Sequence, residues 1–119
     1  MAEPDWMSRA LRAAQALEAT THKAAGAGHT VYVVLLYDAR RQDPWGLYVG
    51  QTSRDPDWRF DQHKAGYKSS SAVRRFGVCL LRDLTEHLNP MRQWESLELE
   101  AGLAEAFRQS GITWVEGGH

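Results

Sequence analysis

Short hydrophobic blocks, separated by polar stretches that contain glycine or proline, predict the strands of this chain. The block TVYVVLLY (30–37) is β-branched and aromatic and is too short for a typical globular helix, so it predicts a largely buried strand. LYVGQT (47–52) predicts a second strand, and the turn sequence ARRQDPWG between the two indicates a hairpin. GVCLLRDL (77–84) predicts a third strand, and ITWV (112–115) is long enough for a short terminal one.

Three segments, 5–25, 54–66 and 89–111, carry the signals of helix ends. The first is rich in alanine, has Asp5 as a candidate N-cap and stops at a glycine-containing turn. The second offers Asp55 as an N-cap, followed by proline at the first helical position, and it ends at a glycine. The third starts at an Asn-Pro pair and also ends at a glycine.

The order of these elements predicts an α+β fold. We expect a small central sheet, antiparallel or mixed, of about three strands flanked by helices in the order β-β-α-β-α, with an extra N-terminal helix. A chain of 119 residues is long enough for one core but not for two independent ones. We therefore divide it into an N-terminal helix with its linker (1–28) and one body (29–119).

The charge balance excludes some classes of function. A net charge of −1, with both signs evenly mixed, is not typical of a protein whose whole surface binds nucleic acid or membrane. The single cysteine, Cys79, excludes an intramolecular disulfide, and no apolar stretch has the length of a membrane span. The sequence predicts a cytoplasmic protein without membrane association, whose binding sites are local.

One such local site is a basic segment. From His63 to Arg82 the chain has no carboxylate. Four residues of this segment are candidates for contacts with a nucleic-acid backbone: Lys64, Lys68, Arg74 and Arg75. The plain alternative is a solvated loop, because many basic runs are only that.

The C-terminal helix places a carboxylate among apolar side chains. Winding the helix at about 100° per residue puts Glu95, Glu98 and Glu105 on the outward side and Glu100 within the apolar arc. The expected arc consists of Trp94, Leu97, Ala101, Leu103, Ala104 and Phe107. Burying a bare carboxylate costs on the order of several kcal/mol, so Glu100 must be paired with a cation, protonated or bound to a metal.

Two tyrosine-bearing strands, an Arg–His pair and an inward glutamate together resemble the GIY-YIG nuclease superfamily. TVY, with Tyr32, stands where the first motif of that superfamily is expected, although Thr30 replaces its glycine, and YVG (48–50) stands for the second. Arg59 and His63 are four residues apart and therefore share a helix face. The resemblance extends from about Thr30 to the last residue, which makes 29–119 a GIY-YIG-like catalytic domain.

The resemblance implies a metal-dependent endonuclease that hydrolyses phosphodiester bonds in nucleic acid, with DNA favoured. Glu100 would hold one divalent cation, Mg²⁺ or Mn²⁺, because hard cations take oxygen ligands. Arg59 would stabilise the charge of the transition state, since its planar fork matches a phosphate. Tyr32, together with His63, would orient and deprotonate the attacking water, and Tyr48 would contact the phosphate or a metal-bound water.

Two alternatives stay open. The same fold can serve as a catalytically inactive module that binds nucleic acid or protein, and the chain can also be a nuclease toxin or the catalytic subunit of a larger assembly. The sequence also leaves the role of the N-terminal helix open: it can pack on the sheet, form a homodimer or dock a partner protein. Taken singly, each tyrosine and the histidine are also compatible with a packing or surface role.

Overall fold

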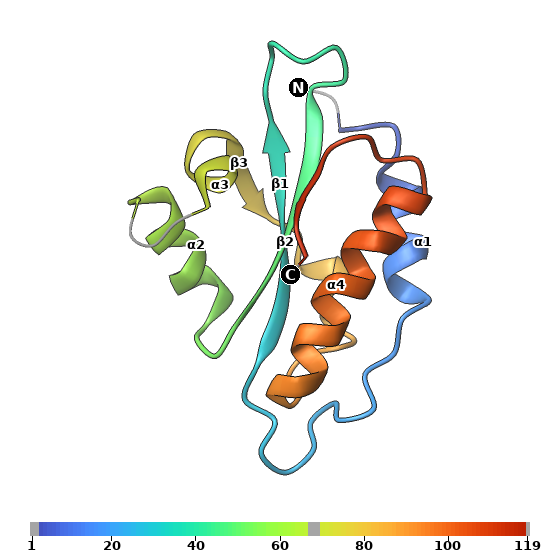
Figure 1. The fold of residues 1–119 in the computed structure, drawn as a ribbon, viewed down its shortest axis with the longest axis vertical. Coiled ribbons are helices and arrows are strands. Elements are labelled where there is room, and N and C mark those ends of the chain that lie inside the picture. The colour runs from blue at the N-terminus through green and yellow to red at the C-terminus, as the bar shows by residue number, and fades with distance from the viewer. Residues whose placement is uncertain (1–2, 67–69, 119) are drawn as a thin grey trace.

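The protein has an α+β fold built on one mixed sheet (Figure 1). The computed structural model describes residues 3–66 and 70–118, and in these residues four strands and four α-helices are present. The elements in chain order are α1 (Met7–Gln15), β1 (Thr30–Tyr37), β2 (Trp45–Thr52), α2 (Pro56–Lys64), α3 (Ser71–Phe76), β3 (Gly77–Leu80), the 3₁₀ helix η1 (Arg82–Leu84), α4 (Gln93–Gln109) and β4 (Val115–Gly117).

The hairpin of β1 and β2 is the centre of the sheet. Every residue of β1 pairs with β2 in antiparallel register, from Thr30 opposite Thr52 to Tyr37 opposite Trp45. β3 pairs with the other edge of β1 in antiparallel orientation, and β4 pairs with β2 in parallel, which gives the order β3-β1-β2-β4. The predicted hairpin is confirmed. The third strand ends at Leu80, before the 3₁₀ helix, instead of running to residue 84, and the short terminal strand lies at 115–117 rather than at 112–115.

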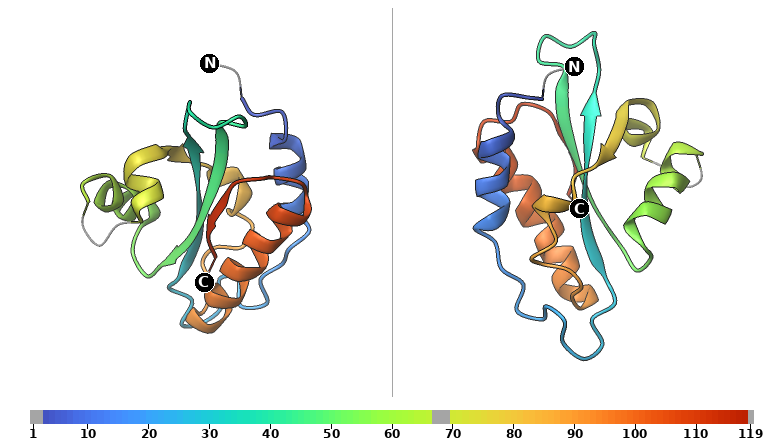
Figure 2. Two further views of the ribbon diagram at one scale, coloured as in Figure 1. Left: turned by 45° about the horizontal axis from the view of Figure 1, so that its top comes forward. Right: turned by 180° about the vertical axis from the view of Figure 1, so that it is seen from behind.

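Different helices cover the two faces of the sheet (Figures 1 and 2). Side chains alternate between the faces of a strand, so odd-numbered residues of β1, such as Val31 and Val33, point to the face covered by α1 and α4. Even-numbered residues, such as Tyr32 and Val34, point to the face on which α2 and α3 pack. Helices on both faces explain why β1 is buried from residue 31 to residue 36.

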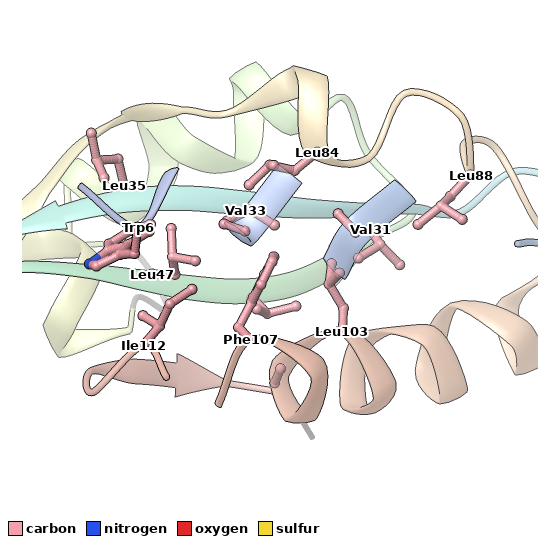
Figure 3. Close-up of a cluster of buried hydrophobic side chains, with 14 of the residues drawn as sticks. Trp6, Val31, Val33, Leu35, Leu47, Leu84, Leu88, Leu103, Phe107 and Ile112 are labelled. Carbon is pink, nitrogen blue, oxygen red and sulfur yellow. The ribbon is translucent and has the colours of Figure 1, made fainter. Parts of the chain in front are cut away.

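The larger core lies on the face of α1 and α4. Phe107 and Leu103 of α4 pack against Val31, Val33 and Leu47 of the hairpin (Figure 3). From the N-terminal helix region the core takes in three further side chains: Trp6, Ala10 and Ala14. The N-terminal helix therefore completes the core of the sheet that it covers.

The N-terminal helix is shorter than the sequence predicted. It ends at Gln15, and its N-cap is Trp6 without a side-chain cap, so the expected cap by Asp5 is not formed. The segment after the helix is held by a buried carboxylate of α4. Glu95 accepts hydrogen bonds from the backbone N–H and the hydroxyl of both Thr20 and Thr21, at 2.6–2.8 Å.

The long C-terminal helix begins at Gln93 and not at the Asn-Pro pair, because the preceding residues are used at the edge of β1. Met91 forms an isolated antiparallel bridge with His29. The Asn89 side chain donates to the Val31 carbonyl and accepts from the Val31 N–H, both at 2.8 Å. The amide of Asn89 thus occupies the place that a peptide group of a further strand would take.

The predicted apolar arc of α4 is partly wrong. Trp94 is 51% exposed, and Leu97 and Ala101 are exposed as well, whereas Glu95 is buried. The residues of α4 that are buried include Ser96, Glu100, Leu103, Ala104 and Phe107. The reason is tertiary: the loop that follows α1 covers the flank of Glu95, and the opposite flank lies open.

The basic segment contains a helix that the sequence pattern did not indicate. α3 follows directly on Ser70, whose hydroxyl accepts a hydrogen bond from the Val73 N–H at 3.5 Å. Val73 is buried against β1, so this segment is not merely a solvated loop. Within the described residues no helix combines the length and apolar character needed to cross a bilayer.

Candidate active site

Tyr32 owes its position to a glycine on the neighbouring strand. Tyr32 lies opposite Gly50 in the hairpin register. A Cβ built on Gly50 would lie 2.5 Å from Cζ and 2.6 Å from the hydroxyl oxygen of Tyr32, so the tyrosine ring crosses the backbone of β2 at this point. Any larger residue at position 50 would displace the Tyr32 hydroxyl, which explains why the YVG motif needs glycine here.

Tyr48 and His63 complete a cluster of rings on the same face. Tyr48 is on the even-numbered face of β2 and lies opposite Val34, two pairs along from Tyr32 and therefore next to it on the same face. Its ring centroid is 6.2 Å from that of Tyr32 and 5.6 Å from that of His63, which α2 contributes. Asp55 caps this helix as predicted, since its carboxylate accepts from the Asp57 N–H at 2.8 Å.

The hydrogen bonds of His63 determine where its proton lies. Its side chain is buried, Nδ1 accepts from the Ser70 N–H at 3.0 Å, and Nε2 lies 2.9 Å from the Tyr32 hydroxyl. Burial, reinforced by the nearby Arg59 guanidinium, lowers the pKa of His63 to about 4, so the ring is neutral at pH 7. Because a backbone N–H can only donate, Nδ1 has no proton, and Nε2–H donates to Tyr32.

The two tyrosines continue this chain of donors. Burial raises the pKa of both hydroxyls, and the Arg59 guanidinium acts in the opposite direction on both. The two hydroxyls are hydrogen-bonded to each other, and because the Tyr32 oxygen already accepts from His63 Nε2–H, the Tyr32 proton is available to Tyr48. Protons therefore point from Ser70 through His63 and Tyr32 to Tyr48, and the Tyr48 hydroxyl ends the chain.

Glu100 reaches the cluster from the other face, at the outer edge of β2. β4 pairs with β2 only at residues 47–49, and beyond it the Gln51 N–H donates to the Glu100 carboxylate. The side chain is 7% exposed, and its Oε1 atom is buried without a hydrogen-bond partner among the described residues. Burial raises the pKa of Glu100 to about 7, and the negative charge of Glu100 in turn raises the pKa of Tyr48.

The unpartnered oxygen of Glu100 fits a hard divalent cation. A buried carboxylate oxygen without a donor is the kind of ligand that Mg²⁺ or Mn²⁺ takes, and a cation would supply the charge that burial disfavours. Among the described residues there is no group of three or more His, Cys, Asp or Glu side chains that could hold a metal. Glu100 would be a protein carboxylate ligand of such a site, with waters completing most of the shell.

No protein-family model matches the chain, and the comparisons with curated proteins and with solved structures give no match either.

The structure gathers the five residues that the sequence singled out for catalysis. They are Tyr32, Tyr48, Arg59, His63 and Glu100, and they are coupled electrostatically through the shifts described above. Two partners were missed: the Gln51 N–H, which positions Glu100, and the Ser70 N–H, which fixes the tautomer of His63. Both act through the backbone, so no residue type in the sequence announces them.

The four residues predicted to contact nucleic acid have different surroundings in the structure. Arg74 and Arg75 are exposed on α3. The ammonium of Lys64 donates to the carbonyls of Arg74 and Gly77, at 3.2 and 3.1 Å, and so ties α2 to the end of α3. Lys68 lies outside the described residues.

A pocket of about 260 Å³ lies beside Tyr32, between β1, the start of α2 and η1. Pro56, Leu80 and Leu81 are among its lining residues, and neither Arg59 nor Glu100 is. Arg59 and Glu100 therefore lie outside this pocket.

Proposed function

We propose that this protein is a metal-dependent endonuclease of the GIY-YIG type, which hydrolyses phosphodiester bonds in nucleic acid and favours DNA. The observation that supports this best is the convergence of a guanidinium, two phenols and a buried carboxylate with an unpartnered oxygen on one place. These are the groups that phosphodiester hydrolysis needs: one to bind and neutralise phosphate, one to activate water, and one to hold a cation.

The arrangement of elements agrees with what the resemblance implies. The two tyrosine motifs lie on the paired strands β1 and β2, and Arg59 and His63 share α2. Glu100 comes from α4, which covers the opposite face of the sheet (Figure 1). Its carboxylate accepts a hydrogen bond from the Gln51 N–H at the edge of β2. The candidate site is thus assembled from four different elements: β1, β2, α2 and α4.

We assign the contact with the attacking water to Tyr48 and not to Tyr32. The Tyr32 oxygen already accepts from His63, and its proton points to Tyr48. Tyr48 ends the chain, so its oxygen is the one that can exchange a proton with a substrate-side water. His63, neutral and without a lone pair at Nε2, then acts as a positioning residue for Tyr32 and not as the base.

Arg59 and Glu100 supply the electrostatic part of the mechanism. The Arg59 guanidinium would contact the scissile phosphate and stabilise the additional charge that develops on it. Glu100 would hold Mg²⁺ or Mn²⁺, which when bound supplies charge neutralisation at the leaving or attacking oxygen. Ionised Glu100 also disfavours a Tyr48 phenolate, so a cation that offsets its charge makes deprotonation of Tyr48 easier.

A cleavage assay tests this proposal. The purified protein is incubated with plasmid, linear duplex and single-stranded nucleic acid, with Mn²⁺ or with chelator, beside the Glu100→Gln variant. We expect cleavage only by the parent and only with the cation. Binding without cleavage under all conditions would favour the inactive binding module, and cleavage by Glu100→Gln would exclude Glu100 as the cation ligand.

A further inference from the structure

Helix α2 buries a histidine and leaves a tryptophan exposed. His63 is 1% exposed, whereas Trp58 on the same helix is 44% exposed. A helix that only completes a core does the reverse, since burying an indole contributes more than burying an imidazole. The position of Trp58 therefore calls for a partner outside the core.

The winding of α2 places Trp58 on the flank that faces away from β3. Asp57 lies on the β3 side, where it forms an ion pair with Arg82 of η1. The next residue, Trp58, is turned by about 100° around the helix from Asp57. It lies on the other side of the direction in which His63 points into the core. In the sheet order, the direction away from β3 leads to β2 and so toward the edge at which Glu100 lies.

Positive charge accompanies the exposed ring. The guanidinium carbon of Arg54 lies 5.3 Å from the centroid of the Trp58 ring. The backbone of Arg54 is fixed in turn, because its N–H donates to the Thr52 hydroxyl at 3.0 Å. Arg59, the residue after Trp58, belongs to the candidate active site, so Trp58 follows the cation of Arg54, in the loop before α2, and directly precedes the cation of Arg59 on α2.

We infer that Trp58 is a stacking platform for an unpaired base next to the scissile phosphate, with Arg54 contacting the neighbouring phosphate. Aromatic rings bordered by cations bind single strands because every base has a π-face, whereas a paired base within a duplex has both faces covered by its neighbours. The substrate is then nucleic acid that is single-stranded at the cut. This inference rests on the proposed function for the identity of the polymer.

The protein offers a matched control on the other helix of the site. Trp94 of α4 is 51% exposed, but it is followed one turn later by the exposed carboxylate Glu98 and not by an arginine. Trp94 therefore serves as a comparably exposed indole on another helix, away from the Arg54 guanidinium that lies over the Trp58 ring.

The experiment measures binding in chelator, where cleavage does not interfere. Fluorescence anisotropy is recorded for a labelled single strand and for the duplex of the same sequence, with the parent, Trp58→Ala, Trp58→Phe and Trp94→Ala. We expect Trp58→Ala to lose about tenfold or more in affinity for the single strand, Trp58→Phe to keep most of it, and Trp94→Ala to keep all of it. Affinity for the duplex should be the same in all four.

Three results would overturn the inference: unchanged single-strand affinity in Trp58→Ala, an equal loss on single strand and duplex, or an equal loss in Trp94→Ala. The outcome is separate from the test of the proposed function. If the parent does not cleave with Mn²⁺ but Trp58→Ala still loses affinity for the single strand, the nuclease proposal is contradicted and the base-stacking role of Trp58 is supported. A parent that binds no nucleic acid contradicts both.

Discussion

At the scale of single residues, one physical cause moves two pKa values in opposite directions. Burial disfavours the charged form, so it raises the pKa of Glu100 from 4.5 to about 7 and lowers that of His63 from 6.5 to about 4. Glu100 favours folding below pH 4.5, and this contribution is lost as the pH rises through 7. His63 favours folding above pH 6.5, and its contribution is lost as the pH falls through 4. Between pH 4.5 and pH 6.5 the two contributions to stability change with pH in opposite directions and partly cancel. Replacing either residue alone should therefore make the stability depend more steeply on pH.

Glu100→Gln should therefore stabilise the protein at pH 8 when no cation is present. The amide keeps an acceptor for the Gln51 N–H and removes the buried charge, which we expect to raise the free energy of unfolding by on the order of 2 kcal/mol. At pH 5, where Glu100 is protonated, the gain should vanish. Thermal unfolding from pH 5 to pH 8 measures it, and a loss of stability at pH 8 would instead identify Glu100 as half of an ion pair.

The two tyrosines should differ in their effect on cleavage. If the Tyr48 hydroxyl contacts the attacking water, Tyr48→Phe should lower kcat by about 10²-fold or more, with a smaller loss for Tyr32→Phe, whose hydroxyl acts through Tyr48. Single-turnover rates at saturating substrate compare the two, and circular dichroism checks that both variants fold. A larger loss in Tyr32→Phe would reverse the assignment.

At the scale of elements, one carboxylate holds a long connection in place. Burial alone would raise the pKa of Glu95, but the hydrogen bonds from Thr21 and Thr20 lower it from 4.5 to about 2. A folded pKa below the usual value means that this contribution to stability is present above pH 4.5 and is lost as the pH falls through 2. The connection between α1 and β1 is thus anchored to α4 by an ionised group.

Glu95→Gln should consequently destabilise the protein at neutral pH. The amide cannot accept all four hydrogen bonds and presents an N–H₂ group to donors, so we expect a loss on the order of 3 kcal/mol. The loss should shrink toward pH 2. Chemical denaturation measures it, and Glu98→Gln, an exposed glutamate of the same helix, should change stability by no more than about 0.5 kcal/mol. Equal effects of the two substitutions would contradict the anchor.

The elements that local sequence determines were predictable, and those that depend on tertiary contacts were not. β1 and β2 follow from β-branched runs, and α2 follows from the Asp55 cap and the proline after it. The face of α4 is different: its sequence allows Trp94 to point inward, and only the loop that covers Glu95 decides the rotation. In the site, residue types identified the five candidates, but the backbone donors that orient them carry no sequence signal.

At the scale of the whole molecule, the N-terminal helix belongs to the core. Trp6 is 2% exposed and packs in the same cluster as Phe107 of α4. Deleting residues 1–25 should therefore leave a body that no longer unfolds cooperatively, since the apolar face of α4 and the hairpin would lose its cover.

Trp6→Ala is the milder form of the same test. We expect it to lower the free energy of unfolding by on the order of 3–5 kcal/mol, with Trp94→Ala near zero as the exposed counterpart. Urea denaturation compares them. A deletion variant with an unchanged, cooperative transition would show instead that α1 is an accessory to an independent body.

The side chain of Asn89 also has a consequence beyond the single chain. The first half of β1 extends past the end of β3, and an uncovered strand edge is a template for pairing with other chains. The Asn89 amide is hydrogen-bonded to both the N–H and the carbonyl of Val31, so neither group is available to pair with a strand of another chain. One polar side chain thus protects the hairpin that carries both tyrosines from intermolecular aggregation.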